Sequence, residues 1–267
     1  MKTRIFPLLL LAGLTTAFFP AASAANLNGL TLSVGFDYSS GKYGTNTTTD
    51  ITSIPVTAHY DSGAWGYELT VPYLRITGTT DVLPGVGRII NTNPSRRVAN
   101  TSSVSSTADG LGDITASATY NLYQGKKQDR GISLTGLIKF GTADANAGLG
   151  TGENDYTLQA NGYRTRGRNT VFGNVAYSVL GSSQYIQLNN VWSLSAGVEH
   201  QLSPISAVGV SYYTRQKSNS SGTAASDATL YYTRNIGNHW KAQAYVLQGF
   251  SNGSPDSGIG ASMAYAF

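Results

Sequence analysis

Three ionisable residues stand where they could act together. Asp113, Lys139 and Asp155 each lie at one end of a segment in which apolar and polar residues alternate. Alternation is the pattern of a β-strand with one apolar face, and neighbouring strands lie about 4.8 Å apart. If the three strands are neighbours, Lys139 can sit between the two carboxylates. Such a cluster could gate a pore or anchor the loops that leave the strands. We favour the anchor.

The polar faces of the alternating segments carry further ionisable residues of mixed sign. A polar interior of this kind can select or orient solutes that enter a barrel. The alternative is a network of ion pairs and hydrogen bonds that packs a narrow barrel, and for any single residue we favour packing. Our candidates for the lumen or a gate are Asp113, Lys139, Asp155, Glu68, Glu199 and Arg215, and Asp37, His59 and Lys241 also face inward.

The residues do not assemble into an enzyme site. His59 faces inward, His200 lies on an apolar face near the end of its strand, and His239 lies in a turn. No serine or acid is placed to complete a catalytic triad with them, and Asp37 and His59 fall at opposite ends of their strands. An outer-membrane lipase or protease is therefore the less favoured alternative. The glycine-rich segment 149–152 lacks the features of a phosphate loop, and the chain has no cysteine for a thiolate metal site. We predict no catalytic residue, cofactor or metal.

Alternating segments recur along the chain and number about twelve. The even count fits a bacterial membrane barrel, and long joins alternate with short ones as extracellular loops alternate with periplasmic turns. The longest irregular segment, Thr77 to Gly110, is expected to be an extracellular loop. Consecutive apolar residues leave the facing of Phe172, Tyr231 and Tyr232 open. The segments are Leu30–Tyr38, Ser53–Tyr60, Trp65–Tyr73, Asp113–Leu122, Ile132–Phe140, Tyr156–Ala160, Val171–Val179, Trp192–Glu199, Val208–Arg215, Ala228–Arg234, Trp240–Gln248 and Ser257–Phe267.

The final segment, Ser257 to Phe267, alternates throughout and has two aromatic residues at its end. An open strand edge invites aggregation, whereas in a closed barrel the last strand pairs with the first and no edge remains. We therefore expect this strand to close the cylinder and its terminal Phe267 to be read by the barrel-assembly machinery. A C-terminal strand in a soluble β-sandwich is the alternative for this stretch alone.

Composition and the N-terminus agree with an exported barrel. Charged residues make up 12% of the chain, against about 25% in a typical soluble domain. Lys2 and Arg4 precede an uncharged run from Leu8 to Phe19 and the small residues 22–24, which predicts a signal peptide cut after Ala24. Its apolar run is shorter than the roughly 20 residues of a spanning helix. Without this segment 16 basic and 14 acidic residues remain, a balance that does not favour a nucleic-acid partner.

Four short motifs occur in order along the chain: Gly110–Asp113, Lys139–Thr142, Leu149–Gly152 with the nearby Asp155, and Ser254–Asp256. Together they resemble an outer-membrane family labelled the phenol meta-pathway barrel, or putative transporter. Gly141 departs from the proline expected in the lysine motif, which bears on the shape of that loop. The resemblance implies an outer-membrane protein that moves small, often apolar or aromatic, compounds.

Residues 1–24 are predicted to be a signal peptide, and residues 25–267 to form an all-β, antiparallel up-and-down barrel in the outer membrane of a Gram-negative bacterium. The barrel is expected to give small molecules a passive path that the Thr77–Gly110 loop gates. A non-conducting structural or binding barrel is the main alternative. The expected partners are outer-membrane lipid, a small solute and the assembly machinery.

Overall fold

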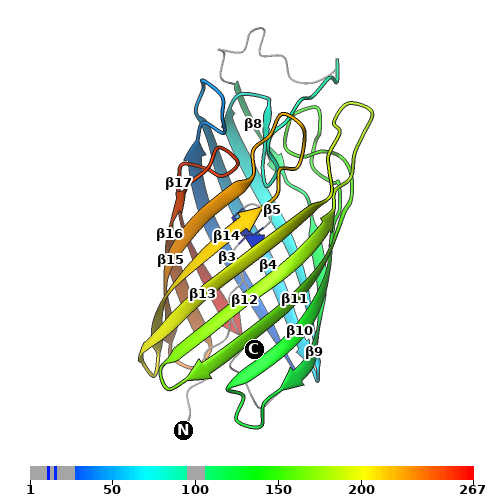
Figure 1. Ribbon diagram of the computed structural model, residues 1–267. Coiled ribbons are helices and arrows are strands. Elements are labelled where there is room, and N and C mark those ends of the chain that lie inside the picture. The colour runs from blue at the N-terminus through cyan, green and yellow to red at the C-terminus, as the bar shows by residue number, and fades with distance from the viewer. Residues whose placement is uncertain (1–10, 13–14, 17–27, 95–105) are drawn as a thin grey trace.

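The computed structural model describes residues 11–12, 15–16, 28–94 and 106–267, and its wall is a closed antiparallel barrel (Figure 1). No helix long and apolar enough to cross a membrane occurs among these residues. The predicted signal peptide falls almost wholly outside the described ranges, so its cleavage stays a prediction. A two-residue ladder, β1 (Leu11–Ala12) with β2 (Thr15–Thr16), precedes the barrel.

Twelve long strands make up the described wall, and each pairs with its neighbours in the chain. The last strand pairs with the first from Ser257 opposite Ser40 to Ala266 opposite Thr31, so the sheet has no free edge between them. This closure was predicted. In order around the barrel the strands are β3 (Asn28–Gly41), β4 (Thr49–Ser62), β5 (Trp65–Gly78), β9 (Thr115–Gln124), β10 (Arg130–Lys139), β11 (Asp155–Arg166), β12 (Asn169–Val179), β13 (Val191–Ser203), β14 (Ser206–Arg215), β15 (Ala225–Ile236), β16 (Trp240–Gly249) and β17 (Ser257–Ala266).

The outer surface is apolar and the inside is polar, as a barrel in lipid requires. Leu158, which faces outward, is 62% exposed, whereas the inward-facing Thr70 is buried. Aromatic residues gather on the outside toward both ends, where the membrane interfaces lie. Trp65 packs against Tyr120 at a centroid distance of 4.8 Å, with the two rings tilted, toward the short-turn end. The predicted inward and outward faces are confirmed.

Four aromatic rings on the inside lie against the wall. In each case the residue directly opposite on the next strand is a glycine, and a Cβ at that glycine would collide with the ring. The ring therefore covers the neighbouring strand and does not project across the lumen. Phe172 and Tyr231, whose facing the sequence left open, both point inward in this way. The pairs are Tyr163 on Gly131, Phe172 on Gly197, Tyr231 on Gly209 and Tyr245 on Gly260.

The prediction of one irregular loop from Thr77 to Gly110 was wrong in part. The segment contains a hairpin, β6 (Val82–Leu83) with β7 (Gly87–Arg88). It also contains a wall strand, β8 (Ser106–Leu111), that pairs with the C-terminal half of β5. β9 pairs with the N-terminal half of β5. β8 and β9 together therefore take the place of one wall strand that is interrupted between them. The break lies opposite Pro72, whose carbonyl accepts a hydrogen bond from Gly112 N at 2.8 Å.

The two ends of the barrel differ. Turns 63–64, 125–129, 167–168, 204–205 and 237–239 are short and lie at one end, where β3 begins and β17 ends (Figure 1). The connections at the other end are longer and include 180–190, a join that the sequence interpretation did not identify as long. Since outer-membrane barrels have short periplasmic turns and long extracellular loops, the short-turn end is periplasmic.

Candidate functional site

The hairpin β6–β7 covers the extracellular mouth. It starts from β5 and reaches β14, which is the sixth strand away in a ring of twelve and so lies on the opposite wall. Leu83, Val86 and Ile89 of the hairpin segment are buried in an apolar cluster with Ile186 from the 180–190 connection. Burial of apolar side chains stabilises this position of the hairpin.

Polar contacts hold the tip of the hairpin to the far wall. The Arg215 guanidinium donates hydrogen bonds to the carbonyl oxygens of Gly85 and of Val86, the latter at 3.0 Å. Ser218 Oγ donates to the same Val86 oxygen at 3.2 Å, and Asn219 Nδ2 donates to the Arg88 oxygen at 2.7 Å. Arg215, predicted as a lumen or gate residue, thus contacts the β6–β7 hairpin. We call Arg215, Ser218 and Asn219 the latch.

A cavity of about 170 Å³ lies beneath the hairpin, within the upper lumen. Pro84 and Gly85 form part of its roof, and Leu74, Leu149 and Leu247 contribute apolar lining. An apolar cavity of about 150 Å³ inside a protein accepts benzene, so this volume suits one small ring. We call this cavity the chamber.

Tyrosines and acids give the chamber a polar component. Asp37 is 5% exposed and its Oδ1 accepts a hydrogen bond from the Tyr245 hydroxyl at 2.8 Å, while Oδ2 has no partner among the described residues. Asp227 Oδ2 accepts a hydrogen bond from Ser254 Oγ at 2.8 Å. Tyr43, from the 42–48 connection, is buried against the chamber, and this burial raises its pKa to about 12. The phenol therefore stays neutral at ordinary pH.

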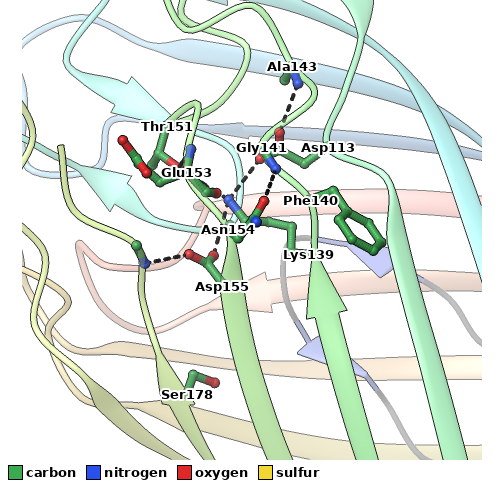
Figure 2. Close-up of polar contacts among 12 residues, drawn as sticks. Asp113, Lys139, Phe140, Gly141, Ala143, Thr151, Glu153, Asn154, Asp155 and Ser178 are labelled. Atoms are coloured by element: carbon green, nitrogen blue, oxygen red, sulfur yellow. Dashed lines mark hydrogen bonds and ion pairs between the residues drawn. The ribbon is translucent and has the colours of Figure 1, made fainter.

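Lys139 lies between Asp113 and Asp155 at the edge of the chamber (Figure 2). Its Nζ is 2.8 Å from Asp113 Oδ2 and 3.1 Å from Asp155 Oδ2. The second oxygen of each carboxylate accepts a loop amide, from Ala143 at 2.9 Å and from Gly181 at 2.8 Å. The cluster thus ties two extracellular connections to the wall, as an anchor does.

The acids of the chamber outnumber its bases. Asp37, Asp113 and Asp227 line it together with Lys139 and Arg215, and Asp155 lies directly behind Lys139. Asp227 was missed from the sequence because it precedes the predicted strand 228–234. Asp227 shares the inward face of β15 with Tyr231. If the strand had been predicted to begin before residue 227, with Tyr231 pointing inward, Asp227 would have been a candidate.

The remaining candidates form separate groups toward the periplasmic end. Glu68 lies 3.6 Å from His59 Nδ1, and Glu199 accepts a hydrogen bond from the Tyr231 hydroxyl at 3.2 Å. Lys241 is buried in the interior. The structure does not bring these residues to the Lys139 cluster.

The histidines lie apart from one another and from the chamber. His59 contacts Asp61 and Glu68, His200 contacts Asn169 at 2.7 Å, and His239 contacts the backbone of Ala266 at 2.8 Å. Within the described chain, their hydrogen-bond partners include no serine hydroxyl, and no cluster of histidine and acidic residues is suited to a metal ion.

Comparison with solved structures finds the same fold in outer-membrane proteins. The COG4313 outer membrane channel from Pseudomonas putida F1 matches with a TM-score of 0.66 at 11% identity, over 91% of this chain and 97% of that one. The translocator domain of the autotransporter NalP from Neisseria meningitidis matches with a TM-score of 0.55 at 15% identity, over 91% and 90%. The KdgM porin in complex with disordered oligogalacturonate matches with a TM-score of 0.52 at 9% identity, over 88% and 99%.

These similar structures are described as a channel, a translocator domain and a porin. No curated protein matches the sequence. Residues 21–267 match the family model described as "Putative MetA-pathway of phenol degradation". The chain therefore belongs to this family, and it is a β-barrel of the Gram-negative outer membrane.

Proposed function

We propose that this barrel gives small, largely apolar molecules a passive path across the outer membrane, and that hairpin β6–β7 is its lid. The observation that carries the proposal is the chamber, a ring-sized space inside the lumen with the lid as part of its roof. Ligand pockets are mostly apolar with a few placed polar groups, and the chamber has this composition. The match to a channel structure supports passage in general.

The inner wall supports movement below the chamber. Tyr231 and Tyr245 lie flat over glycines of the next strand, so two bulky inward-facing side chains leave the axis of the barrel free. Their rings also offer an apolar surface along the wall. A solute that leaves the chamber can therefore continue toward the periplasmic end without displacing them.

The contacts of the lid allow it to open. The latch makes four hydrogen bonds to the hairpin segment, and a hydrogen bond contributes about 1 kcal/mol net. About 4 kcal/mol of polar stabilisation corresponds to an open fraction of roughly one in a thousand. The apolar cluster lowers that fraction further, so the barrel is closed most of the time.

Liposome swelling tests the proposal. We would replace residues 81–89 with a short glycine–serine linker and compare the variant with the full chain in liposomes that contain benzyl alcohol, glucose or a disaccharide. The expected result is faster entry of the ring-sized solute in the variant, with the disaccharide still excluded. If neither protein admits any solute, the non-conducting barrel is the better account.

We also propose that the barrel-assembly machinery recognises β17, whose outward side chains include Ile259 and Met263, together with the exposed Phe267 that follows it. Phe267→Ala should then lower the amount of folded barrel in the outer membrane of growing cells. Refolding of the purified variant into detergent should be unchanged, because assembly in cells and folding in vitro depend on different contacts.

A further inference from the structure

Two arginines lie directly opposite each other on the outer surface at the periplasmic end. Arg130 of β10 and Arg164 of β11 are cross-strand partners. Both are exposed and share the outward face with the apolar Ile132 and Val171. The Cβ atoms of such partners are about 5 Å apart, and like charges at this spacing destabilise a sheet.

Neither arginine makes an ion pair within 4 Å in the described chain. The surroundings add positive charge. The turn 125–129 contributes Lys126 and Lys127, and Arg166 and Arg168 stand beside Arg164, whereas Asp129 is the single acid in residues 125–130 and 164–168. Repulsion of this kind is relieved when an anion binds between the charges.

A furrow leads from the arginines toward the membrane. Gly162 and Gly173 are cross-strand partners on the outward face, next to Arg164 and Val171. With two glycines side by side, the outer surface lacks the side chains that cover it elsewhere. The residues around this open hollow are Gly162, Tyr163, Arg164, Arg166, Asn169, Val171, Phe172 and Gly173.

The depth of the pair fits a lipid headgroup. Tyr123, which is exposed on the outside, lies opposite Ile132, and Arg130 lies two residues further toward the periplasm. Tyrosines mark the membrane interface. The guanidinium groups therefore stand at the level of phosphates, and the glycine furrow runs inward from them at the level of acyl chains.

We propose that Arg130, Arg164 and the furrow form a binding site for an anionic phospholipid of the periplasmic leaflet. The two guanidinium groups clamp its phosphodiester, because arginine binds phosphate oxygens through paired N–H groups. One acyl chain lies over Gly162 and Gly173. A lipid explains both halves of the site, whereas free phosphate would leave the furrow without a role. This proposal does not depend on the transport function.

Thermal unfolding of the full barrel tests the site. The test variant is Arg130→Gln/Arg164→Gln, reconstituted in phosphatidylcholine vesicles with and without one fifth phosphatidylglycerol. The matched control is Arg75→Gln, since Arg75 is also exposed and faces outward but lies toward the other end opposite Asp109. Phosphatidylglycerol should raise the midpoint temperature of unfolding of the wild type and of the control. It should not raise that of the double variant.

The difference in unfolding temperature between the double variant and the wild type is expected to have opposite signs in the two membranes. In pure phosphatidylcholine the double variant should unfold above the wild type, because the like-charge pair is gone. In native mass spectrometry its affinity for phosphatidylglycerol should fall roughly 25-fold, since each basic residue near an anionic surface contributes about fivefold.

Three results would overturn the proposal. The first is an equal gain from phosphatidylglycerol in wild type and double variant. The second is an equal loss of lipid affinity in the Arg75→Gln control. The third is a wild type that inorganic phosphate stabilises as much as the lipid does, which would mean that the arginines bind phosphate without a lipid.

Discussion

Replacement of Lys139 with methionine isolates the charge at the anchor. Methionine keeps most of the length of lysine and removes its ammonium group. Asp113 and Asp155 would then face each other without a cation, and Asp155 is 0% exposed. Both carboxylates would still accept the amides of Ala143 and Gly181, so they could not move apart without loosening the loops.

Removal of one partner from a buried ion pair costs about 3–5 kcal/mol. We take the lower end, about 3 kcal/mol, because Asp113 borders the chamber and retains some contact with solvent. The ratio of folded to unfolded protein should therefore fall roughly 100-fold. The loops at residues 140–154 and 180–190 should become easier to cleave with protease.

Urea unfolding of refolded protein, followed by tryptophan fluorescence, measures the loss. The informative partner is the triple variant Asp113→Asn/Lys139→Met/Asp155→Asn. Asparagine keeps an oxygen for each loop amide and carries no charge, so the triple variant should unfold within about 1 kcal/mol of the wild type. If Lys139→Met is as stable as the wild type, or the triple variant is as unstable as the single one, the anchor reasoning is wrong.

Three further predictions concern the lid, the wall and the chamber. Arg215→Met removes two of the four latch hydrogen bonds, and at about 1 kcal/mol each the open fraction, and with it the swelling rate for small solutes, should rise roughly 30-fold. The exposed Lys217→Gln control should leave the rate unchanged. Gly209→Val should cost about 1–3 kcal/mol by overpacking against Tyr231, and urea unfolding should show that Tyr231→Ala in the same chain recovers part of this loss. Benzylamine should enter liposomes about tenfold faster than benzoate, because the excess of acids in the chamber attracts positively charged solutes. Asp37→Asn should reduce the difference between the two rates. Faster entry of benzoate would contradict the prediction that the chamber favours cations.

The wall could be predicted from the sequence because lipid and lumen impose opposite polarity on alternate residues. Leu30 to Tyr38 shows this, since each outward residue is apolar and the intervening ones are small or polar. The position of Lys139 between two acids followed from the same pattern, because Lys139 and Asp155 end neighbouring strands and Asp113 lies just before β9. Geometry between consecutive antiparallel strands is local and therefore predictable.

The lid could not be predicted in the same way. Its strands β6 and β7 have two residues each, too few to show a period. The contacts that fix it join Val86 to Ser218 and Arg215, which are more than a hundred residues away. The facing of Tyr231 depended on Gly209 of the adjacent strand, and that pairing is visible only once the register is known. Contacts across the mouth fixed the hairpin, and packing against the adjacent strand fixed the facing of Tyr231.

A reversible lock on the lid tests the central claim most directly. The chain has no cysteine, so Val86→Cys/Ser218→Cys introduces the sole thiol pair, which a bis-maleimide linker with a disulfide in its spacer can join. The two residues are neighbours, because Ser218 Oγ donates a hydrogen bond to the Val86 backbone carbonyl at 3.2 Å. Swelling of the same liposomes is measured with benzyl alcohol before and after the disulfide is reduced. A movable lid over a conducting lumen predicts little entry while the bond is intact and restored entry on reduction. Equal rates in both states, with the crosslink shown to have formed, would contradict it.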